Sequence, residues 1–218
     1  MPWGLKRFHE SGQSHSVTFC CYHRRPLFPT AIAKRIFEAA LERVRCRFGL
    51  HVYGYVIMPE HVRLLLSEPQ RDTLADALKS LKQGVSRRLI GDDPDHFWQK
   101  RYYDFNVRNQ QQFVEKVRYI HRNPVKRGLC ERAEDWEWSS FLHYATGCKG
   151  RIEIESEWTA RKRERAAGRL CSVVELPHSS IHLGMDLSGE TSAQKTALSL
   201  QELLRNEEER QGRQPLKV

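Results

Sequence analysis

The sequence has little of what a membrane-bound or exported protein needs. It contains no uncharged apolar run of about 18 residues, the length that crosses a bilayer. The segment MPWGLKRFHE at residues 1–10 carries positive charges with no apolar stretch after them, which argues against a secretory signal. These absences predict a cytoplasmic protein with no membrane partner.

Paired cysteines are also lacking. The 6 cysteines lie at positions 20, 21, 46, 130, 148 and 171, and no two of them have C-x-x-C spacing. This spacing argues against a zinc ribbon and against a thioredoxin-type redox motif. Without an export signal, we expect the cysteines to be reduced thiols.

Positive charge is present in excess and is unevenly distributed. Lys and Arg number 36 against 27 Asp and Glu, a net charge of +9. Residues 1–151 hold 26 basic and 16 acidic side chains, whereas residues 152–218 hold 10 and 11. The first part therefore favours a polyanionic partner such as nucleic acid. An ordinary soluble basic protein is the alternative.

Apolar periodicity predicts four strands and three helices. Apolar residues recur at three-to-four spacing after Thr30, which is placed to cap a helix that Gly49 would end. The last helix is expected to stop before Asn123-Pro124, because proline disfavours a helical residue before it. The predicted strands are 15–22, 51–58, 61–67 and 102–107, and the predicted helices are 31–47, 72–89 and 110–122.

This order favours an α+β fold of the ferredoxin-like kind, an antiparallel sheet with helices on one face. The other face would then be open to a flat or elongated ligand. Residues 1–160 are predicted to form one domain, with the aromatic segment 135–147 packed over its core. Residues 161–218 are expected to form a mobile C-terminal extension with one weak amphipathic helix at 198–210.

Two side chains of the third predicted strand are candidates for chemistry. His61 and Arg63 alternate with apolar residues and therefore point to the same face. An imidazole there could ligate a divalent metal or bind a phosphate. A solvent-exposed histidine at the end of a strand, without a function, is the alternative.

The last predicted helix supplies a second pair. Tyr119 and Asn123 are four positions apart and share one face, with Lys116 close by. A phenol is a nucleophile when its proton is removed or its oxyanion stabilised, and an amide oxygen could help to ligate a metal. An amphipathic tyrosine at the edge of a helix is the structural alternative. The stretch 99–109, QKRYYDFNVRN, interleaves aromatic and basic residues, which suits single-stranded nucleic acid or an ordinary half-buried strand.

Several long motifs in the right order resemble the REP-associated tyrosine transposases, a branch of the single-tyrosine HUH transposases of bacterial insertion sequences. The similarity covers about residues 4–160. The motifs are LKRFHESGQSHSVTFCCYHRRPLF, VYGYVIMPEHVRLLLSEP, LKSLKQGVSRR, FWQKRYYDFNVR and KVRYIHRNPVKRGLCERAEDWEWSSFLHYATG.

The resemblance implies a ferredoxin-like nuclease and strand transferase that acts on single-stranded, hairpin-bearing DNA. In such proteins two histidines hold Mg²⁺ or Mn²⁺, and a helix tyrosine attacks the scissile phosphate to give a 5′-phosphotyrosine. His61 matches the first motif histidine, Tyr119 in VRYIHRNPV matches the nucleophile, and Asn123 matches a position that completes the metal site. The expected partner is DNA, with no small-molecule substrate.

Arg63 departs from this pattern, because the family has histidine there. A guanidinium stays protonated and has no lone pair for a metal. Either the metal site is crippled and the protein is an impaired DNA-hairpin binder, or Arg63 contacts the scissile phosphate and replaces part of the metal's charge. Both alternatives stay open.

Basic residues on the predicted helices and the fourth strand are candidates for DNA contacts. An unrelated nuclease built from carboxylates such as Asp72, Asp104 and Glu115 is a further alternative, although these show no recognisable spacing. The candidate DNA-binding residues are Arg63, Lys79, Lys82, Arg87, Arg88, Arg101, Arg108, Lys116, Arg118, Arg122, Lys126 and Arg127.

Overall fold

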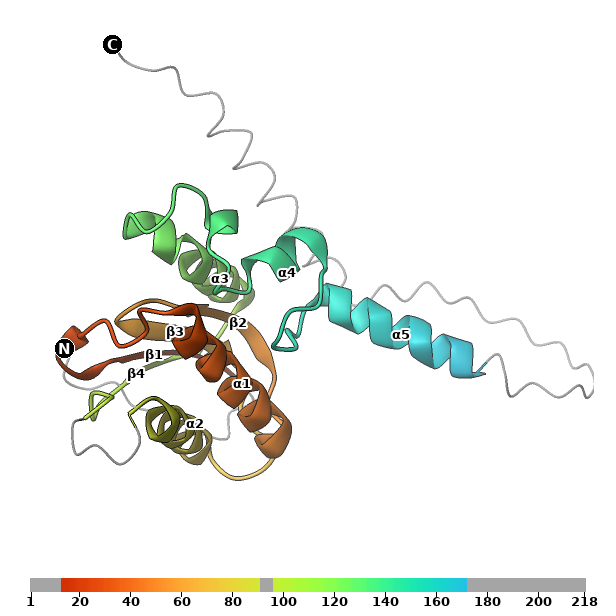
Figure 1. Cartoon of the computed structure of the whole chain (residues 1–218). Helices are drawn as coiled ribbons and strands as arrows, with labels where there is room; N and C mark the ends of the chain where they lie inside the picture. The colour runs from red at the N-terminus through yellow and green to blue at the C-terminus, as the bar shows by residue number, and fades with distance from the viewer. Residues whose placement is uncertain (1–12, 91–95, 172–218) are drawn as a thin grey trace, which may run out of the picture. The chain divides into compact units, whose positions relative to one another are not determined.

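The computed structural model describes residues 13–90 and 96–171, with side chains as far as residue 165. Its elements follow the predicted alternation of strands and helices (Figure 1). They are β1 (Ser14–Cys20), η1 (Tyr22–Arg24), α1 (Ala31–Phe48), β2 (Val52–Ile57), β3 (His61–Leu66), α2 (Leu74–Leu89), β4 (Tyr103–Val107), α3 (Gln110–Lys126), η2 (Ala133–Asp135), α4 (Phe141–Thr146) and α5 (Glu157–Cys171).

The four strands form one antiparallel sheet in the order β2-β3-β1-β4. The two inner strands, β1 and β3, pair from His15 opposite Leu66 to Cys20 opposite His61. This order, with one helix after β1 and one after β3, is that of a ferredoxin-like fold. The predicted α+β class and antiparallel sheet are confirmed.

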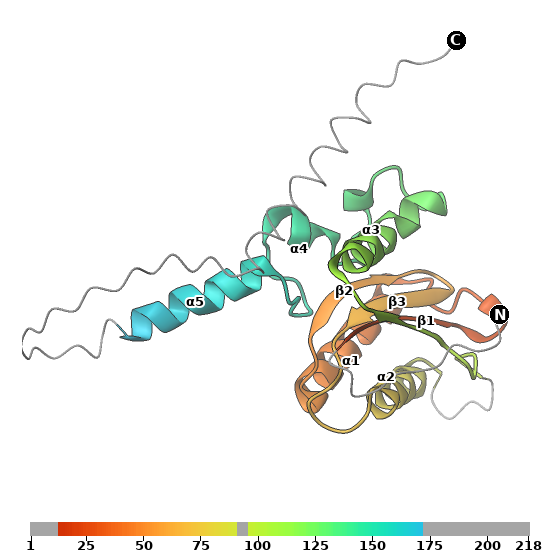
Figure 2. The same ribbon diagram turned by 180° about the vertical axis from the view of Figure 1, so that it is seen from behind.

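The helices cover both faces of the sheet. α1 and α2 pack on one face around a core that includes Phe19, Phe37 and Leu81. α3 packs on the other face, where Val117 and Ile120 lie in a second core cluster with strand residues such as Leu65. Figures 1 and 2 show α3 on the side of the sheet opposite α1 and α2. The expectation of helices on one face therefore holds for α1 and α2 only, because the apolar stripe of α3 buries itself on the face that was expected to be open.

Local capping explains where α1 begins and ends. The Thr30 side chain accepts a hydrogen bond from the Ala33 amide at 3.2 Å, which satisfies one free N–H of the first turn. Gly49 ends the helix in the left-handed conformation, with φ of 63°, which glycine adopts without strain. Both predicted caps are confirmed.

The end of α3 differs from the prediction. The helix continues through Asn123 and Pro124 to Lys126. Pro124 lies in the last turn of the helix, where its missing N–H costs one hydrogen bond. The side chains of Asn123 and Pro124 are both buried. The Arg127 amide donates to the Asn123 carbonyl at 3.1 Å, so the last turn closes despite the proline. Tertiary burial outweighs the local preference here, and as a result Asn123 stays on the same helical face as Tyr119.

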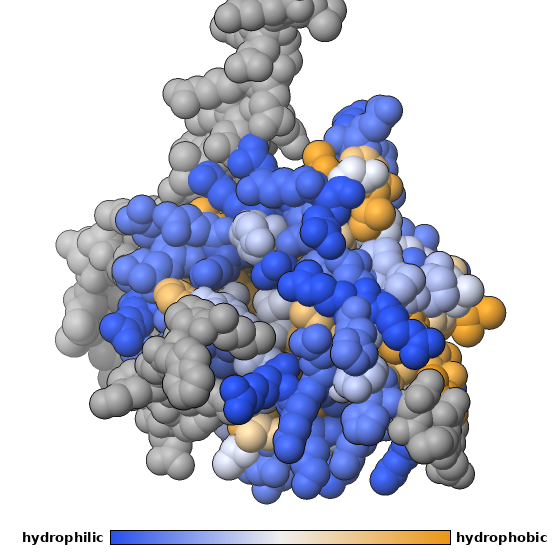
Figure 3. All heavy atoms as spheres, turned by 90° about the vertical axis from the view of Figure 1, so that its left-hand side faces the viewer, coloured by the Kyte–Doolittle hydropathy of each residue, from blue (hydrophilic) through white to orange (hydrophobic). Residues whose placement is uncertain are grey.

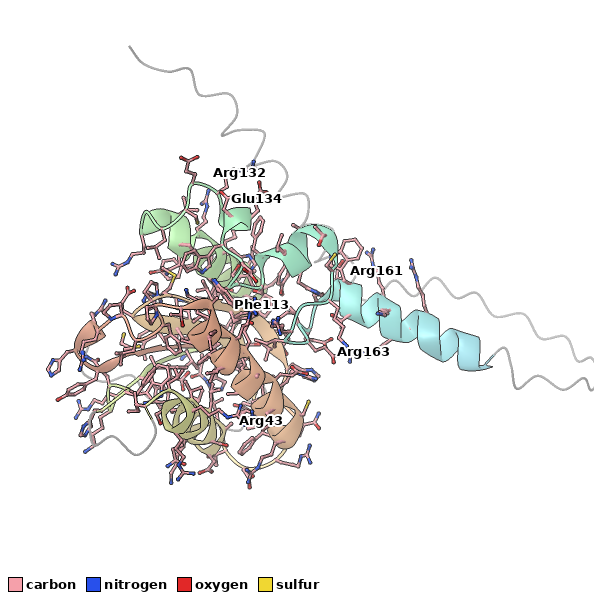
Figure 4. The ribbon with its side chains drawn as sticks, viewed as in Figure 1. Arg43, Phe113, Arg132, Glu134, Arg161 and Arg163 are labelled. Carbon is pink, nitrogen blue, oxygen red and sulfur yellow. The ribbon has the colours of Figure 1, made fainter. Side chains whose placement is uncertain are left out.

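The aromatic segment after α3 packs as predicted. Trp138 is only 8% exposed and joins the core beside α1. Its carbonyl accepts from the Ile57 amide at 2.9 Å, so this segment also satisfies the outer edge of β2. Nearby, the Phe113 ring of α3, labelled in Figure 4, lies 5.2 Å from the Tyr53 ring of β2.

The chain divides into two units, residues 1–156 and 157–218. The second unit begins with α5, which includes Arg161 and Arg163 (Figure 4). The predicted extension at 161–218 lies mostly outside the described residues, as does the predicted helix at 198–210, and both stay predictions. Among the helices within residues 13–90 and 96–171, none combines the length and apolar character of a membrane span.

Candidate functional site

One small cavity brings together the residues singled out from the sequence. It has a volume of about 130 Å³ and lies between the inner strands and α3. His61 and Arg63 reach it from β3, and Tyr119 and Asn123 reach it from α3. The described residues that line it are Thr18, Cys20, Arg24, His61, Arg63, Tyr119, Asn123, Lys126 and Arg127.

His61 opens β3 directly after the tight turn at Pro59-Glu60 and is 4% exposed. Its Nδ1 lies 3.1 Å from the Glu60 Oε1 carboxylate oxygen, so we assign the ring proton to Nδ1. Burial, reinforced by the nearby Arg63 charge, lowers the pKa of His61 to about 4. The ring is therefore neutral at pH 7, and its Nε2 lone pair has no hydrogen-bond partner within the part of the chain that the structure describes.

Asn123 supplies a second unsatisfied acceptor. It is 4% exposed, and its Oδ1 has no partner among the described residues. Buried polar atoms normally find partners, so these two acceptors are free to take a donor or a cation. The buried Arg63 Nε donor in the same cavity is likewise without a partner among the described residues and is free to take an acceptor. His61 Nε2 and Asn123 Oδ1 are therefore suited to ligate a divalent metal, which the resemblance implies. Within residues 13–90 and 96–171, no three His, Cys, Asp or Glu side chains gather closely enough to hold a metal by themselves.

Tyr119 lies at the mouth of the cavity rather than in the interior. Its side chain is 41% exposed, which leaves it accessible to a large substrate. The ring is flanked by two cations, the Arg63 guanidinium carbon at 4.6 Å and Lys126 Nζ at 5.5 Å from its centroid. Such contacts orient an aromatic ring and place positive charge beside the phenol.

Arg63 occupies the place of the expected second histidine. Its Nη1 donates to Thr18 Oγ1 at 3.1 Å, and its guanidinium stacks on Tyr119. Burial lowers the pKa of Arg63, yet a guanidinium remains protonated at any ordinary pH. Arg63 thus adds fixed positive charge to the cavity and cannot ligate a metal.

Sequence reasoning missed two contributors, Glu60 and Arg24. Glu60 accepts from Arg127 Nη2 at 2.5 Å as well as facing His61. Burial alone would raise the pKa of Glu60, but hydrogen bonds and nearby charges, led by the hydrogen bond from Arg127, together outweigh burial and lower this pKa. Glu60 is therefore an ionised carboxylate in contact with the His61 Nδ1 atom. The position of Glu60 next to His61 in the sequence could have indicated its role. Its partner Arg127 lies 67 residues further along the chain, so the ion pair could not be predicted from local sequence.

Arg24 reaches the cavity from η1 through an unusual backbone. Arg24 and the preceding His23 have φ of 55° and 51°, a left-handed conformation that costs energy for non-glycine residues. The sequence carries no turn glycine that would have indicated this bend.

The candidate DNA-binding residues do not form one cluster. Arg63, Lys126 and Arg127 line the cavity, whereas Lys79 and Arg87 line a groove of about 650 Å³ between α1 and α2, on the opposite face of the sheet. Arg43 of α1, labelled in Figure 4, lines the same groove. The side of the molecule shown in Figure 3 is mostly hydrophilic.

The other candidates are dispersed. Lys82 is half-buried and donates to the Gln99 carbonyl at 2.9 Å, so it has a structural partner. Lys116 lies over the Phe105 ring with Nζ 4.3 Å from the centroid. Arg88 is exposed on α2, Arg101 and Arg108 are exposed on either side of β4, and Arg122 is exposed on α3. Arg118 is partly buried on α3.

The carboxylate alternative finds no site. Asp104 is buried on the α1–α2 face of the sheet, where its Oδ1 lies 3.0 Å from His15 Nδ1. Asp72 lines the groove between α1 and α2, and Glu115 is exposed on α3. These three carboxylates therefore do not share a site.

A ferredoxin-like sheet with a neutral histidine, an amide and an accessible tyrosine around one cationic cavity is the arrangement that the motif resemblance implies. The sequence model of the family described as "Transposase IS200 like" matches residues 10–123, and the chain belongs to this family.

Individual relatives agree. The chain is 26% identical over 117 residues to a putative REP-associated tyrosine transposase of Haemophilus influenzae, an alignment that covers 48% of this chain and 66% of that protein, just under two thirds of its length. It is 25% identical over 137 residues to the REP-associated tyrosine transposase of Escherichia coli, covering 62% of this chain and 81% of that one.

The fold also matches a solved structure, that of a REP-associated tyrosine transposase bound to a REP hairpin. The TM-score is 0.58 at 20% sequence identity, and the match covers 70% of this chain and 92% of the other. The resemblance to REP-associated tyrosine transposases is thus confirmed.

Proposed function

We propose that this protein is a nuclease and strand transferase that acts on single-stranded, hairpin-bearing DNA in DNA transposition. The observation that carries the proposal is the shared cavity of Tyr119, His61 Nε2 and Asn123 Oδ1. This cavity contains an exposed candidate nucleophile, Tyr119, and two acceptor atoms without described partners, and four Lys and Arg side chains line it. The cytoplasmic location expected from the sequence stays a prediction.

In the proposed reaction the Tyr119 oxygen attacks the scissile phosphorus. The phenol loses its proton to solvent, the bond from phosphorus to the 3′ oxygen breaks, and that oxygen leaves as a 3′-hydroxyl after taking up a proton. The DNA 5′ end stays on Tyr119 as a phosphotyrosine. Attack by another 3′-hydroxyl restores the phenol and joins the strands, so the phosphodiester bond energy is conserved.

His61 and Asn123 would hold the divalent cation, Mg²⁺ or Mn²⁺ on the family pattern. When bound, the cation polarises the scissile phosphate and neutralises charge that develops in the transition state. Glu60 keeps the His61 lone pair directed away from itself and into the cavity. Arg63, Lys126 and Arg127 attract and orient the phosphate, because they line the same cavity.

The DNA partner is supported by the charge of the first part of the chain and by the hairpin bound to the structural neighbour. Binding through Lys and Arg releases counterions, so affinity should fall steeply with salt. The cavity cations would engage the cleaved strand, and the exposed Arg101 and Arg108 beside β4 would engage flanking phosphates.

Arg63 favours a second candidate, a catalytically impaired DNA-hairpin binding protein. Its guanidinium stands where a second metal-ligating imidazole is expected, so cation binding would rest on fewer donors. This candidate predicts salt-sensitive hairpin binding without cleavage.

Incubation with 5′-labelled and 3′-labelled hairpin-bearing DNA separates the two candidates. The nuclease gives a covalent protein–DNA adduct with Mg²⁺, Mn²⁺, Co²⁺ or Zn²⁺ present, and Tyr119→Phe abolishes it. Tyr22→Phe is the matched control, because Tyr22 is 37% exposed and lies outside the cavity. Hairpin binding with no adduct under any of these metals would reject the nuclease and support the binding protein.

A further inference from the structure

Cys20 is a cavity residue that the proposed reaction leaves without a role. It is the last residue of β1 and lies directly opposite His61 in the antiparallel register. Residues opposite each other in such a pair have Cβ atoms about 4.5–5.5 Å apart and side chains on the same face. Cys20 and His61 therefore project side by side into the cavity, on the side of the sheet that α3 covers.

The cavity holds three donor atoms of different kinds. Within residues 13–90 and 96–165, neither His61 Nε2 nor Asn123 Oδ1 has a partner, and the two residues are each 4% exposed. Cys20 is a free thiol of intermediate exposure. Two buried acceptors and a thiol therefore line one cavity, in which the Arg63 Nε donor is also without a partner among the described residues.

We propose that Cys20 Sγ is a third metal ligand and that this centre selects a thiophilic divalent metal such as Zn²⁺ over Mg²⁺. Magnesium demands oxygen ligands in octahedral geometry, whereas zinc accepts nitrogen, sulfur and oxygen donors. Three protein ligands with a fourth position open to water or substrate is the usual form of a catalytic zinc site. The inference rests on the proposed function for the use of the open position, which would receive the scissile phosphate.

The thiol also compensates for the charge that Arg63 introduces. On metal binding the Cys20 proton leaves to solvent, and the resulting thiolate adds negative charge to a cavity lined by Arg24, Arg63, Lys126 and Arg127. An amide and a neutral imidazole supply none. A neutral histidine at position 63 would add a ligand and no charge. Arg63 adds a positive charge and no ligand, and Cys20 would supply both a ligand and a compensating negative charge.

The backbone of Arg63 is offset along the strand from the Cys20–His61 pair, although its charge still acts on His61. It pairs with Thr18 in the register, two residues along β1 from the pair of Cys20 and His61. Two residues correspond to about 7 Å along a strand. The hydrogen bond to Thr18 Oγ1 and the stack on Tyr119 hold the guanidinium in this position.

A DNA-free titration with Co²⁺ tests the ligand set. The full chain, stripped with a chelator and kept reduced, is titrated while the near-ultraviolet and visible spectra are recorded. We expect one equivalent to produce a thiolate-to-cobalt charge-transfer band and tetrahedral visible bands, and Zn²⁺ but not excess Mg²⁺ to displace them. Cys20→Ser should lose the charge-transfer band and weaken Zn²⁺ affinity at least tenfold.

Cys130→Ser is the matched control, because Cys130 has the same intermediate exposure and lies outside the cavity. It should keep the band. No band in the unmodified chain, or a band that survives in Cys20→Ser, would overturn the proposal.

Alkylation of the unmodified chain tests the site without any variant. Stoichiometric Zn²⁺ should slow iodoacetamide labelling of Cys20 at least tenfold, as measured by mass spectrometry, while the exposed Cys46 and Cys148 react as before. Equal labelling of Cys20 with and without Zn²⁺ would refute the site. Neither experiment contains DNA, so a failure of the adduct assay and a failure of this ligand set give different results.

Discussion

The Arg63 guanidinium lies over the Tyr119 ring, with its central carbon 4.6 Å from the ring centroid. The residue that departs from the family pattern therefore contacts the proposed nucleophile directly. This contact and the hydrogen bond to Thr18 give Arg63 a fixed place in the cavity. Arg63 therefore provides no metal ligand at this position; it provides positive charge and a contact that orients the Tyr119 ring.

Arg63→His should strengthen metal binding. The new imidazole would share a strand face with His61, two residues away, and would replace a charge that repels cations. We expect Mn²⁺ affinity to rise at least tenfold and the yield of covalent adduct to rise with it. Calorimetry and the labelled-hairpin assay measure the two effects.

Arg63→Lys is the control for this change, because it keeps the charge and adds no ligand. It should show no gain in Mn²⁺ affinity. Unchanged or weaker Mn²⁺ binding in Arg63→His would contradict this account of the departure.

Glu60→Ala should disable His61 without removing it. The carboxylate fixes the proton on Nδ1 at 3.1 Å and is itself held by Arg127. Its loss frees the tautomer and the ring orientation, which in metal sites typically costs about 10–100-fold in affinity. Nitrogen NMR of the imidazole should show a mixture of tautomers in the variant.

Glu60→Gln supplies the rescue arm for this prediction, since its amide oxygen still accepts from Nδ1. Metal affinity should recover most of the way, and Glu131→Ala, an exposed position, should have no effect. Equal losses in Glu60→Ala and Glu60→Gln would show that charge rather than orientation is what Glu60 provides.

Much of the fold, and the two pairs of site residues that share a face, can be predicted from the sequence because they depend on local periodicity. Alternation in β3 places His61 and Arg63 on one face, and four-residue spacing places Tyr119 and Asn123 on one face of α3. What brings the two faces together is long-range packing. The position of α3 opposite α1 and α2, and its continuation through Pro124, come from burial that no local pattern records.

The same limit applies to Glu60 and Cys20. Both are visible in the sequence, but their roles depend on partners that the fold supplies. Arg127 reaches Glu60 across 67 positions, and Cys20 meets His61 only through the register of β1 with β3.

Trp138→Ala should destabilise the first unit by about 3–5 kcal/mol, the usual cost of removing a large buried aromatic side chain. Trp138 is 8% exposed, and Lys34 Nζ lies 5.4 Å from its ring. Urea unfolding followed by far-ultraviolet circular dichroism measures the change. Leu142→Ala is the control, because Leu142 is 44% exposed and should change stability by less than about 0.5 kcal/mol.

A final prediction concerns a buried histidine far from the cavity. His15 is fully buried, with Nδ1 3.0 Å from Asp104 and Nε2 3.3 Å from Glu68. Burial opposes protonation, but the hydrogen bonds and charges of Asp104 and Glu68 outweigh it and raise the pKa of His15 above 6.5. The folded state therefore binds this proton more tightly than the unfolded state does.

The resulting stabilisation is fully present below about pH 6.5, the pKa of an unfolded histidine, and is lost as the pH rises through the higher folded-state value. Urea unfolding should give a lower free energy at pH 8.5 than at pH 6. His15→Gln should flatten this part of the profile and cost about 1–3 kcal/mol at pH 6, because the buried hydrogen bond to Asp104 is lost. A slope that persists in His15→Gln would assign the pH dependence to a different group.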